Sequence, residues 1–82
     1  MAKVQLVYTK QCVYCPSAKI LFKDLKKQYK FDYEEIDAMS PEGQKLVSKY
    51  SIMAVPSIIV DGKLMWTGVP QKDKVIAVVA GK

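Results

Sequence analysis

The chain has 82 residues, half of them hydrophobic, which favours one domain spanning residues 1–82 with a single small core. Its formal charge of +5 comes entirely from lysine, and the absence of arginine, the usual reader of guanine and phosphate, argues against a nucleic-acid partner. No apolar run approaches the roughly 18 residues that span a bilayer, so no membrane partner is expected.

The first predicted strand, residues 4–8, is rich in β-branched and aromatic side chains and is interrupted only by Gln5. This pattern is typical of a central strand that is buried on both faces. No hydrophobic signal segment or cleavage site precedes it, so we expect a mature, cytoplasmic protein.

A helix is predicted after the loop at residues 9–11, because apolar residues recur with helical spacing from Ala18 to Tyr29. We expect it to begin near Cys12, with Pro16 in its first turn or just past it. Lysines fill its other face and should point outward. These are Lys19, Lys23, Lys26, Lys27 and Lys30.

Residues 31–36 alternate loosely between apolar and acidic side chains, which suits an edge strand with one wet face. Strand, helix and strand in this order predict a right-handed parallel unit. Ser40 as N-cap and Pro41 as first residue then start a second helix, which Gly43 should keep short.

Two further strands, residues 58–60 and 64–66, are joined by Asp61-Gly62, which predicts a hairpin with a type I′ turn. Pro70 is expected to open a third helix, and Gly81 to end it. The residues expected to pack this helix down are Val75, Ile76, Val79 and Ala80. Met53 and Trp66 are expected in the core or at the edge of a groove.

Both cysteines lie in Cys12-Val13-Tyr14-Cys15-Pro16, where the first strand gives way to the first helix. Thiols with this spacing can form a disulfide with little backbone movement, and the positive end of a helix favours a thiolate. We therefore predict Cys12 as the nucleophile and Cys15 as the resolving thiol. A zinc site needs four ligands, and this chain has no histidine and no third cysteine, which argues against such a site. The same spacing is also compatible with a structural disulfide or with a pair of inert thiols.

The element order βαβαββα, with the cysteine pair after the first strand and a proline before the third, resembles the thioredoxin fold in its minimal glutaredoxin-like form. Residues 12–19, CVYCPSAK, resemble the glutaredoxin pattern C-P-Y-C-x-x-A-K and depart from it only at Val13. The resemblance implies an α/β fold with a four-stranded mixed sheet and helices on both faces. It also implies that Pro56 is a cis proline facing the cysteines, that Val55 offers its backbone to an extended substrate, and that Tyr14 lines the substrate groove.

The departures from both relatives leave the electron donor open. The Gly-Gly-x-Asp-Asp-like stretch of glutaredoxins is reduced to Gly68 and Asp73, and Ala54 replaces the usual threonine before Val-Pro. The thioredoxin signature W-C-G-P-C is absent as well, because Gln11 stands in place of the tryptophan. The first strand also lacks an acidic residue that could act as a proton shuttle.

We therefore expect an oxidoreductase, a glutaredoxin-like protein-disulfide reductase with a role in electron transport and cell redox homeostasis. Its substrates would be proteins containing disulfides, and its electrons would come from a thioredoxin-type reductase or from glutathione as co-substrate. No metal or tightly bound cofactor is expected, and the chain should be a monomer. The residues expected to bind substrate are Lys10, Tyr14, Val55, Pro56 and Gly68, of which Lys10 also stands close enough in sequence to favour the Cys12 thiolate.

A binding module is the alternative function. A thioredoxin-fold domain of this kind would hold a metal or iron-sulfur cluster between two chains, with external thiols completing the ligands. The presence of Cys15 beside Cys12 argues against it, because cluster-carrying relatives usually keep a single active thiol.

Overall fold

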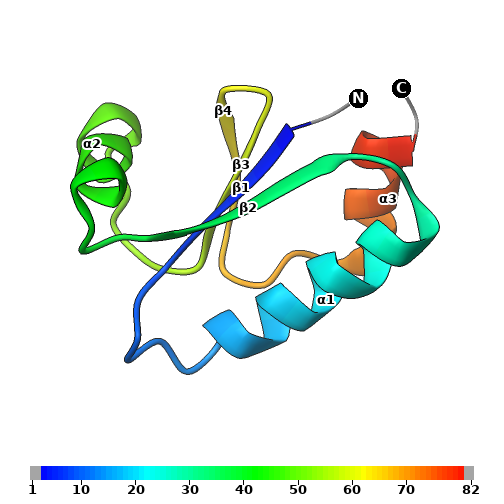
Figure 1. Ribbon diagram of the computed structural model, residues 1–82, viewed down its shortest axis with the longest axis horizontal. Helices are drawn as coiled ribbons and strands as arrows, with labels where there is room; N and C mark the ends of the chain where they lie inside the picture. The colour runs from blue at the N-terminus through cyan, green and yellow to red at the C-terminus, as the bar shows by residue number, and fades with distance from the viewer. Residues whose placement is uncertain (1–2, 81–82) are drawn as a thin grey trace.

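The structure, a computed structural model, describes residues 3–80 (Figure 1). In chain order its elements are β1 (Lys3–Tyr8), α1 (Cys15–Gln28), β2 (Asp32–Asp37), α2 (Pro41–Tyr50), β3 (Ser57–Val60), β4 (Lys63–Thr67) and α3 (Lys72–Ala80). The strands form one mixed sheet in the order β2-β1-β3-β4. Figure 1 shows α2 on one face of this sheet and α1 and α3 on the other. The predicted α/β fold with element order βαβαββα is confirmed.

Strand β1 is the central strand that its composition predicted. Val4, Leu6 and Val7 are fully buried, with Val4 and Leu6 facing α1 and α3 and Val7 facing α2. β1 pairs in parallel with β2 and antiparallel with β3. The predicted parallel unit and the edge position of β2 are therefore confirmed. The carboxyl ends of β1 and β2 meet at the same edge of the sheet.

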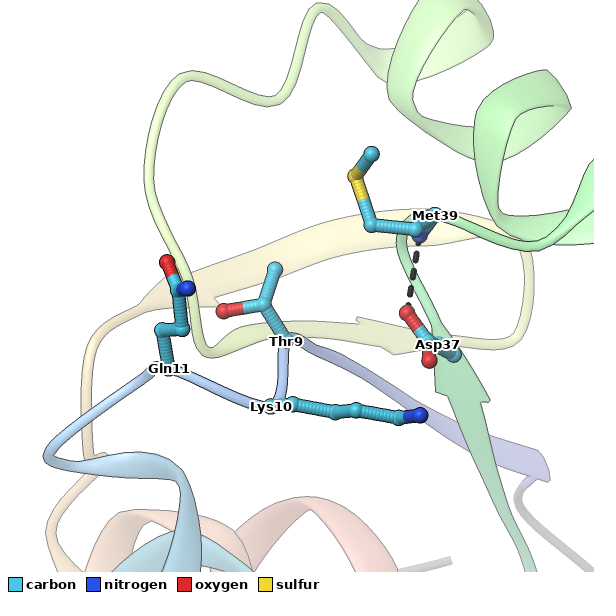
Figure 2. Close-up of a pocket in the computed structure, with 5 residues that line it drawn as sticks. All are labelled: Thr9, Lys10, Gln11, Asp37 and Met39. Carbon is cyan, nitrogen blue, oxygen red and sulfur yellow. Dashed lines mark hydrogen bonds between the residues drawn. The ribbon is translucent and has the colours of Figure 1, made fainter.

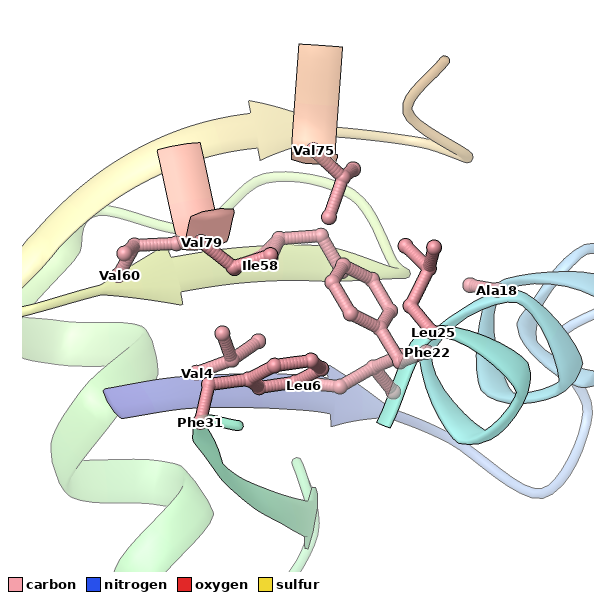
Figure 3. Close-up of a cluster of buried hydrophobic side chains, with 10 residues drawn as sticks. All are labelled: Val4, Leu6, Ala18, Phe22, Leu25, Phe31, Ile58, Val60, Val75 and Val79. Carbon is pink, nitrogen blue, oxygen red and sulfur yellow. The ribbon is translucent and has the colours of Figure 1, made fainter. Parts of the chain in front are cut away.

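The core is divided by the sheet into two clusters of buried side chains. The larger cluster lies between the sheet and helices α1 and α3 (Figure 3). Its buried members are Val4, Leu6, Ala18, Phe22, Leu25, Phe31, Ile58, Val60, Val75 and Val79. The smaller cluster, formed by Val7, Ala38 and Ile59, lies beneath α2. Helix α1 is therefore held to the sheet by its apolar stripe, which fixes the position of its first turn.

The start of α2 follows the sequence closely. The hydroxyl of Ser40 accepts a hydrogen bond from the Gly43 N–H at 3.0 Å, and Pro41 is the first helical residue. Gly43 is buried, and a Cβ atom there would collide with the carbonyl oxygen of Asp37 and with Cα of Ala38. Glycine thus permits a close approach of α2 to the end of β2, a role that sequence alone did not reveal.

The hairpin between β3 and β4 has the predicted type I′ turn, because Asp61 and Gly62 both have positive φ angles, 51° and 80°. The predicted start of the third helix at Pro70 was wrong, because α3 begins at Lys72, two residues later. The Val75 N–H donates to the carbonyl of Gln71, so the first helical hydrogen bond starts after the proline. Gly81 lies outside the described residues.

Four side chains differ from the sequence-based expectations or complete them. Ala80 is exposed rather than packed against the sheet. Met53 is not part of the core, since 94% of its surface is exposed, whereas Trp66 packs against the edge of the larger cluster. Lys19 is partly buried, because its ammonium lies 3.6 Å above the centre of the Tyr8 ring.

Among the helices within residues 3–80, none has the length and apolar character needed to cross a membrane.

Candidate active site

The two cysteines are joined by a disulfide between the β1–α1 loop and the first residue of α1. Cys12 lies in the loop, Cys15 begins the helix, and their Cα atoms are 5.4 Å apart. The expectation that the helix begins near Cys12 was therefore wrong by about one turn. Pro16 explains the difference, because it has no N–H to donate to the carbonyl of Cys12. A helix cannot form its first hydrogen bond there.

The sulfur of Cys12 nevertheless lies at the amino end of α1. The Cys15 N–H donates to Cys12 Sγ, with a nitrogen-to-sulfur distance of 3.1 Å. The first turn of α1 contains no acidic residue, and its N-cap, Tyr14, makes no side-chain capping bond. The positive end of the helix dipole is therefore not offset by a carboxylate from that turn, and it favours negative charge on the Cys12 sulfur.

The two cysteines differ in their accessibility. Cys15 is buried, with 2% of its surface exposed, whereas Cys12 is partly exposed in the loop. An incoming sulfur atom can therefore approach Cys12 but not Cys15. This asymmetry is what a nucleophile and a resolving thiol require.

The segment with the expected cis proline lies at the same edge of the sheet. The Val55–Pro56 peptide is cis, which is the conformation that the resemblance implied. Ser57, the next residue, pairs with Val7 of β1, so Pro56 lies level with the end of β1 from which the Cys12 loop leaves. The Gly68 N–H donates to the carbonyl of Pro56 at 2.6 Å. Gly68 has a φ angle of 91°, a conformation that favours glycine.

The site is surrounded by exposed apolar side chains. Val13 is 82% exposed and Tyr14 is 66% exposed, both between the cysteines. Val55 is partly exposed beside the buried Pro56. Such a surface suits contact with another molecule, because apolar groups gathered at one place on a surface mark interaction sites.

Lys10 is exposed and lines a pocket beside the Cys12 loop (Figure 2). The pocket is also lined by Asp37, the last residue of β2, and by Met39 in the turn that follows it. Neither residue was identified as part of the site from the sequence. The sequence carries no local signal for them. They join the pocket because the parallel register of β1 and β2 pairs Tyr8 with Asp37 and brings together the residues that follow each strand.

The structure also bears on metal binding and on one unusual tyrosine. Within residues 3–80, no group of three histidine, cysteine, aspartate or glutamate side chains is placed to hold a metal ion.

Burial and a 2.8 Å hydrogen bond to Glu35 raise the pKa of the Tyr33 phenol well above its usual value. Tyr33 packs against Phe22 in the core and belongs to β2, so this shift concerns stability rather than the cysteine pair.

An accessible sulfur and a buried sulfur, linked at the amino end of a helix on this four-stranded sheet, define a thiol-disulfide oxidoreductase with the thioredoxin fold. Residues 2–80 match the family model described as a thioredoxin domain. The chain therefore belongs to the thioredoxin domain family.

Relatives from archaea agree with this assignment. The chain is 29% identical over 82 residues to a probable thioredoxin of Methanothermobacter marburgensis, covering 98% of this chain and 94% of that protein. It is 28% identical over 79 residues to a thioredoxin of Methanocaldococcus jannaschii, covering 94% of this chain and 91% of that protein. A solved structure of a mutant thioredoxin from Halobacterium salinarum superposes with a TM-score of 0.79 at 21% identity, covering 98% of this chain and 73% of that chain. That likeness concerns the fold.

Proposed function

We propose that this protein reduces disulfide bonds in other proteins through the dithiol form of Cys12 and Cys15. The observation that carries the proposal is the asymmetry of the pair. Cys12 is accessible and its sulfur accepts the Cys15 N–H, whereas Cys15 is buried directly behind it. A structural disulfide would not need one accessible sulfur at the positive end of a helix.

The reaction proceeds in two exchanges. The Cys12 thiolate attacks one sulfur of the substrate disulfide, a mixed disulfide forms, and the other substrate sulfur leaves as a thiolate that takes up a proton. Cys15 then loses its proton and attacks the Cys12 sulfur. The second substrate sulfur leaves as a thiolate and takes up a proton, and the protein retains the Cys12–Cys15 disulfide. Two electrons pass from the dithiol to the substrate.

The substrate is held, in this proposal, by the surface around Cys12. An extended substrate segment runs beside Val55 and Pro56, and Tyr14 provides an exposed aromatic surface between the cysteines. Gly68 supports this arrangement because its N–H fixes the Pro56 carbonyl. Lys10 adds a positive charge two residues before Cys12, which favours the thiolate and acidic substrates.

A thioredoxin-type reductase is the proposed electron donor, and glutathione is the alternative. Membership of the thioredoxin domain family supports the first, and the residues that differ from the glutaredoxin pattern, among them Ala54, weaken the second. We also propose that the protein acts as a monomer in the cytoplasm, where disulfides are continually reduced.

The test uses two cysteine variants with a protein disulfide as substrate and a dithiol as reductant. Cys12→Ser should abolish substrate reduction. Cys15→Ser, reduced beforehand and mixed with the substrate after the dithiol has been removed, should accumulate a mixed disulfide that intact mass detects. Undiminished substrate reduction by Cys12→Ser, or a wild-type protein that never forms the Cys12–Cys15 disulfide, would overturn the proposal.

A second measurement identifies the donor. Oxidised protein is mixed with excess reduced glutathione, quenched with acid, and its free and glutathionylated thiols are counted by mass over minutes. Persistence of the disulfide supports a dedicated reductase. Rapid reduction through a Cys12 adduct would instead establish glutathione as the donor.

A further inference from the structure

The pocket beside the Cys12 loop has a volume of about 410 Å³ and lies where β1 and β2 end (Figure 2). Its lining residues are Thr9, Lys10, Gln11, Asp37 and Met39. Three of them immediately precede Cys12 in the chain, and Gln11 is its direct neighbour. Cys12 does not itself line the pocket, but the peptide bond from Gln11 places it one residue from the pocket wall.

The pocket contains one positive and one negative side chain. Figure 2 shows the Lys10 side chain extended toward Asp37. Neither residue belongs to an ion pair shorter than 4.0 Å within residues 3–80. Oδ1 of Asp37 accepts the Met39 N–H at 2.8 Å, which leaves the carboxylate further capacity to accept hydrogen bonds. Both charges are thus available to a ligand.

The remaining lining residues complete a polar site. The Thr9 hydroxyl and the Gln11 amide each provide a hydrogen-bond donor and an acceptor. Met39, which is 73% exposed, adds a flexible apolar wall. An α-amino acid group matches this composition, because it carries an ammonium and a carboxylate on a single carbon.

We propose that this pocket binds the zwitterionic amino-acid end of a small disulfide, of which cystine is the simplest, while Cys12 attacks the disulfide. The inference rests on the proposed function, because it uses the same two cysteines. The Cys12 thiolate attacks one cystine sulfur, and the first cysteine leaves as a thiolate and takes up a proton. Cys15 then loses its proton and attacks the Cys12 sulfur, and the second cysteine leaves as a thiolate and takes up a proton. The dithiol loses two electrons, and cystine becomes two cysteines.

The experiment measures single turnovers of fully reduced protein with four disulfides that differ chiefly in charge. Cystine carries both charges at each end, cystamine only ammonium, dithiodipropionate only carboxylate, and hydroxyethyl disulfide neither. Each rate is divided by the rate of dithiothreitol with the same disulfide, which removes the intrinsic reactivity of the disulfide. Cystine should react about two- to fivefold faster than each of the others, the size expected for exposed ion pairs.

Two pocket variants test the assignment of each charge. Lys10→Met should abolish the preference for cystine over cystamine, because the ligand carboxylate loses its partner. Asp37→Asn should abolish the preference for cystine over dithiodipropionate, because the ligand ammonium loses its charged partner. The asparagine side chain keeps an oxygen that can accept the Met39 N–H. Matched controls are Lys63→Met and Asp32→Asn, exposed residues at the opposite end of the sheet, which should retain both preferences.

Equal normalised rates for all four disulfides would overturn the pocket proposal. The proposal would also be overturned if Lys10→Met changed the normalised rate by the same factor for every disulfide. The latter would mean that Lys10 acts on the thiolate and not on the ligand. In either case, continued reduction of a protein disulfide by the wild type would leave the proposed function intact. Loss of that reduction as well would overturn both.

Discussion

Replacement of Gly43 by alanine gives two opposite expectations, depending on whether helix propensity or packing decides the outcome. Gly43 lies inside α2, where alanine is preferred to glycine by about 1 kcal/mol. Propensity alone therefore predicts stabilisation. Gly43 is buried, however, and the added Cβ would overlap the Asp37 carbonyl oxygen and Cα of Ala38. Backbone atoms cannot rotate away as a side chain can, so α2 would have to move.

We expect packing to dominate. Overpacking of a buried site typically costs about 1–3 kcal/mol, and overlap with three backbone atoms of Asp37 and Ala38 places Gly43→Ala at the upper end or beyond. After the propensity gain of about 1 kcal/mol is subtracted, a net destabilisation of about 2 kcal/mol remains. For a domain of this size, that corresponds to a decrease in Tm of roughly 8–16 °C.

The assay is urea and thermal unfolding of the oxidised protein, followed by circular dichroism. Lys45→Ala serves as the control, because Lys45 is exposed in the same helix and its replacement should change the free energy of unfolding by less than about 0.5 kcal/mol. An increase in stability for Gly43→Ala would refute the reasoning. It would mean that α2 does not approach the end of β2 as closely as the structure shows.

Three further substitutions test the fold. Ser40→Ala removes the acceptor of the Gly43 N–H and should lower the free energy of unfolding by about 1 kcal/mol in urea titrations, whereas Ser40→Asp should largely retain it. Phe22→Ala should cost about 3–5 kcal/mol by the same measurement, because the ring is fully buried; a loss below about 1 kcal/mol would contradict its place in the core. Since the pKa of Tyr33 is raised in the folded protein, its contribution to stability should be complete below about pH 10 and lost as the pH rises above that value. Unfolding measured from about pH 8 to about pH 11 should therefore show a steeper loss for the wild type than for Tyr33→Phe, and parallel curves would contradict the burial of the phenol.

The order of the elements could be predicted from the sequence because each element carries its own local signal. Asp61-Gly62 specifies the hairpin through two positive φ angles, and Ser40 with Pro41 specifies the start of α2. Each of these residues determines the backbone conformation only of its close neighbours in the sequence. The start of α3 was harder to place, because Pro70 is compatible with a first helical turn but equally with the extended segment that precedes one.

The first turn of α1 shows why a correct motif can give a wrong boundary. The pattern of residues 12–19 places a helix after the cysteines but does not state which residue begins it. Proline is favoured near the start of a helix, and that preference was compatible with a start at Cys12. The missing N–H of Pro16 excludes that start. The consequence for the site is that Cys12 lies in the loop, where it is accessible.

Residues that depend on contacts between distant segments could not be predicted. Asp37 and Met39 belong to the pocket only because β2 pairs in register with β1, and Gly43 is needed only because α2 packs on the turn after β2. Lys19 was predicted on the outer face from its helical position. It is partly buried because the ring of Tyr8, from another element, lies beneath its ammonium.

The absence of an acidic residue in β1 becomes significant once burial is known. Ser57 is the one buried polar side chain among the described residues, and the β1 residues that face the core on the side of α1 are Val4 and Leu6. No carboxylate in that part of the chain is therefore buried and able to take a proton from Cys15. In the proposed mechanism, the Cys15 proton therefore passes to solvent or to the departing substrate thiolate. The negative charge on the Cys12 sulfur is stabilised by the Cys15 N–H and the end of α1. The chemistry then depends on backbone geometry, which explains how so short a chain can support it without a histidine or a buried acid.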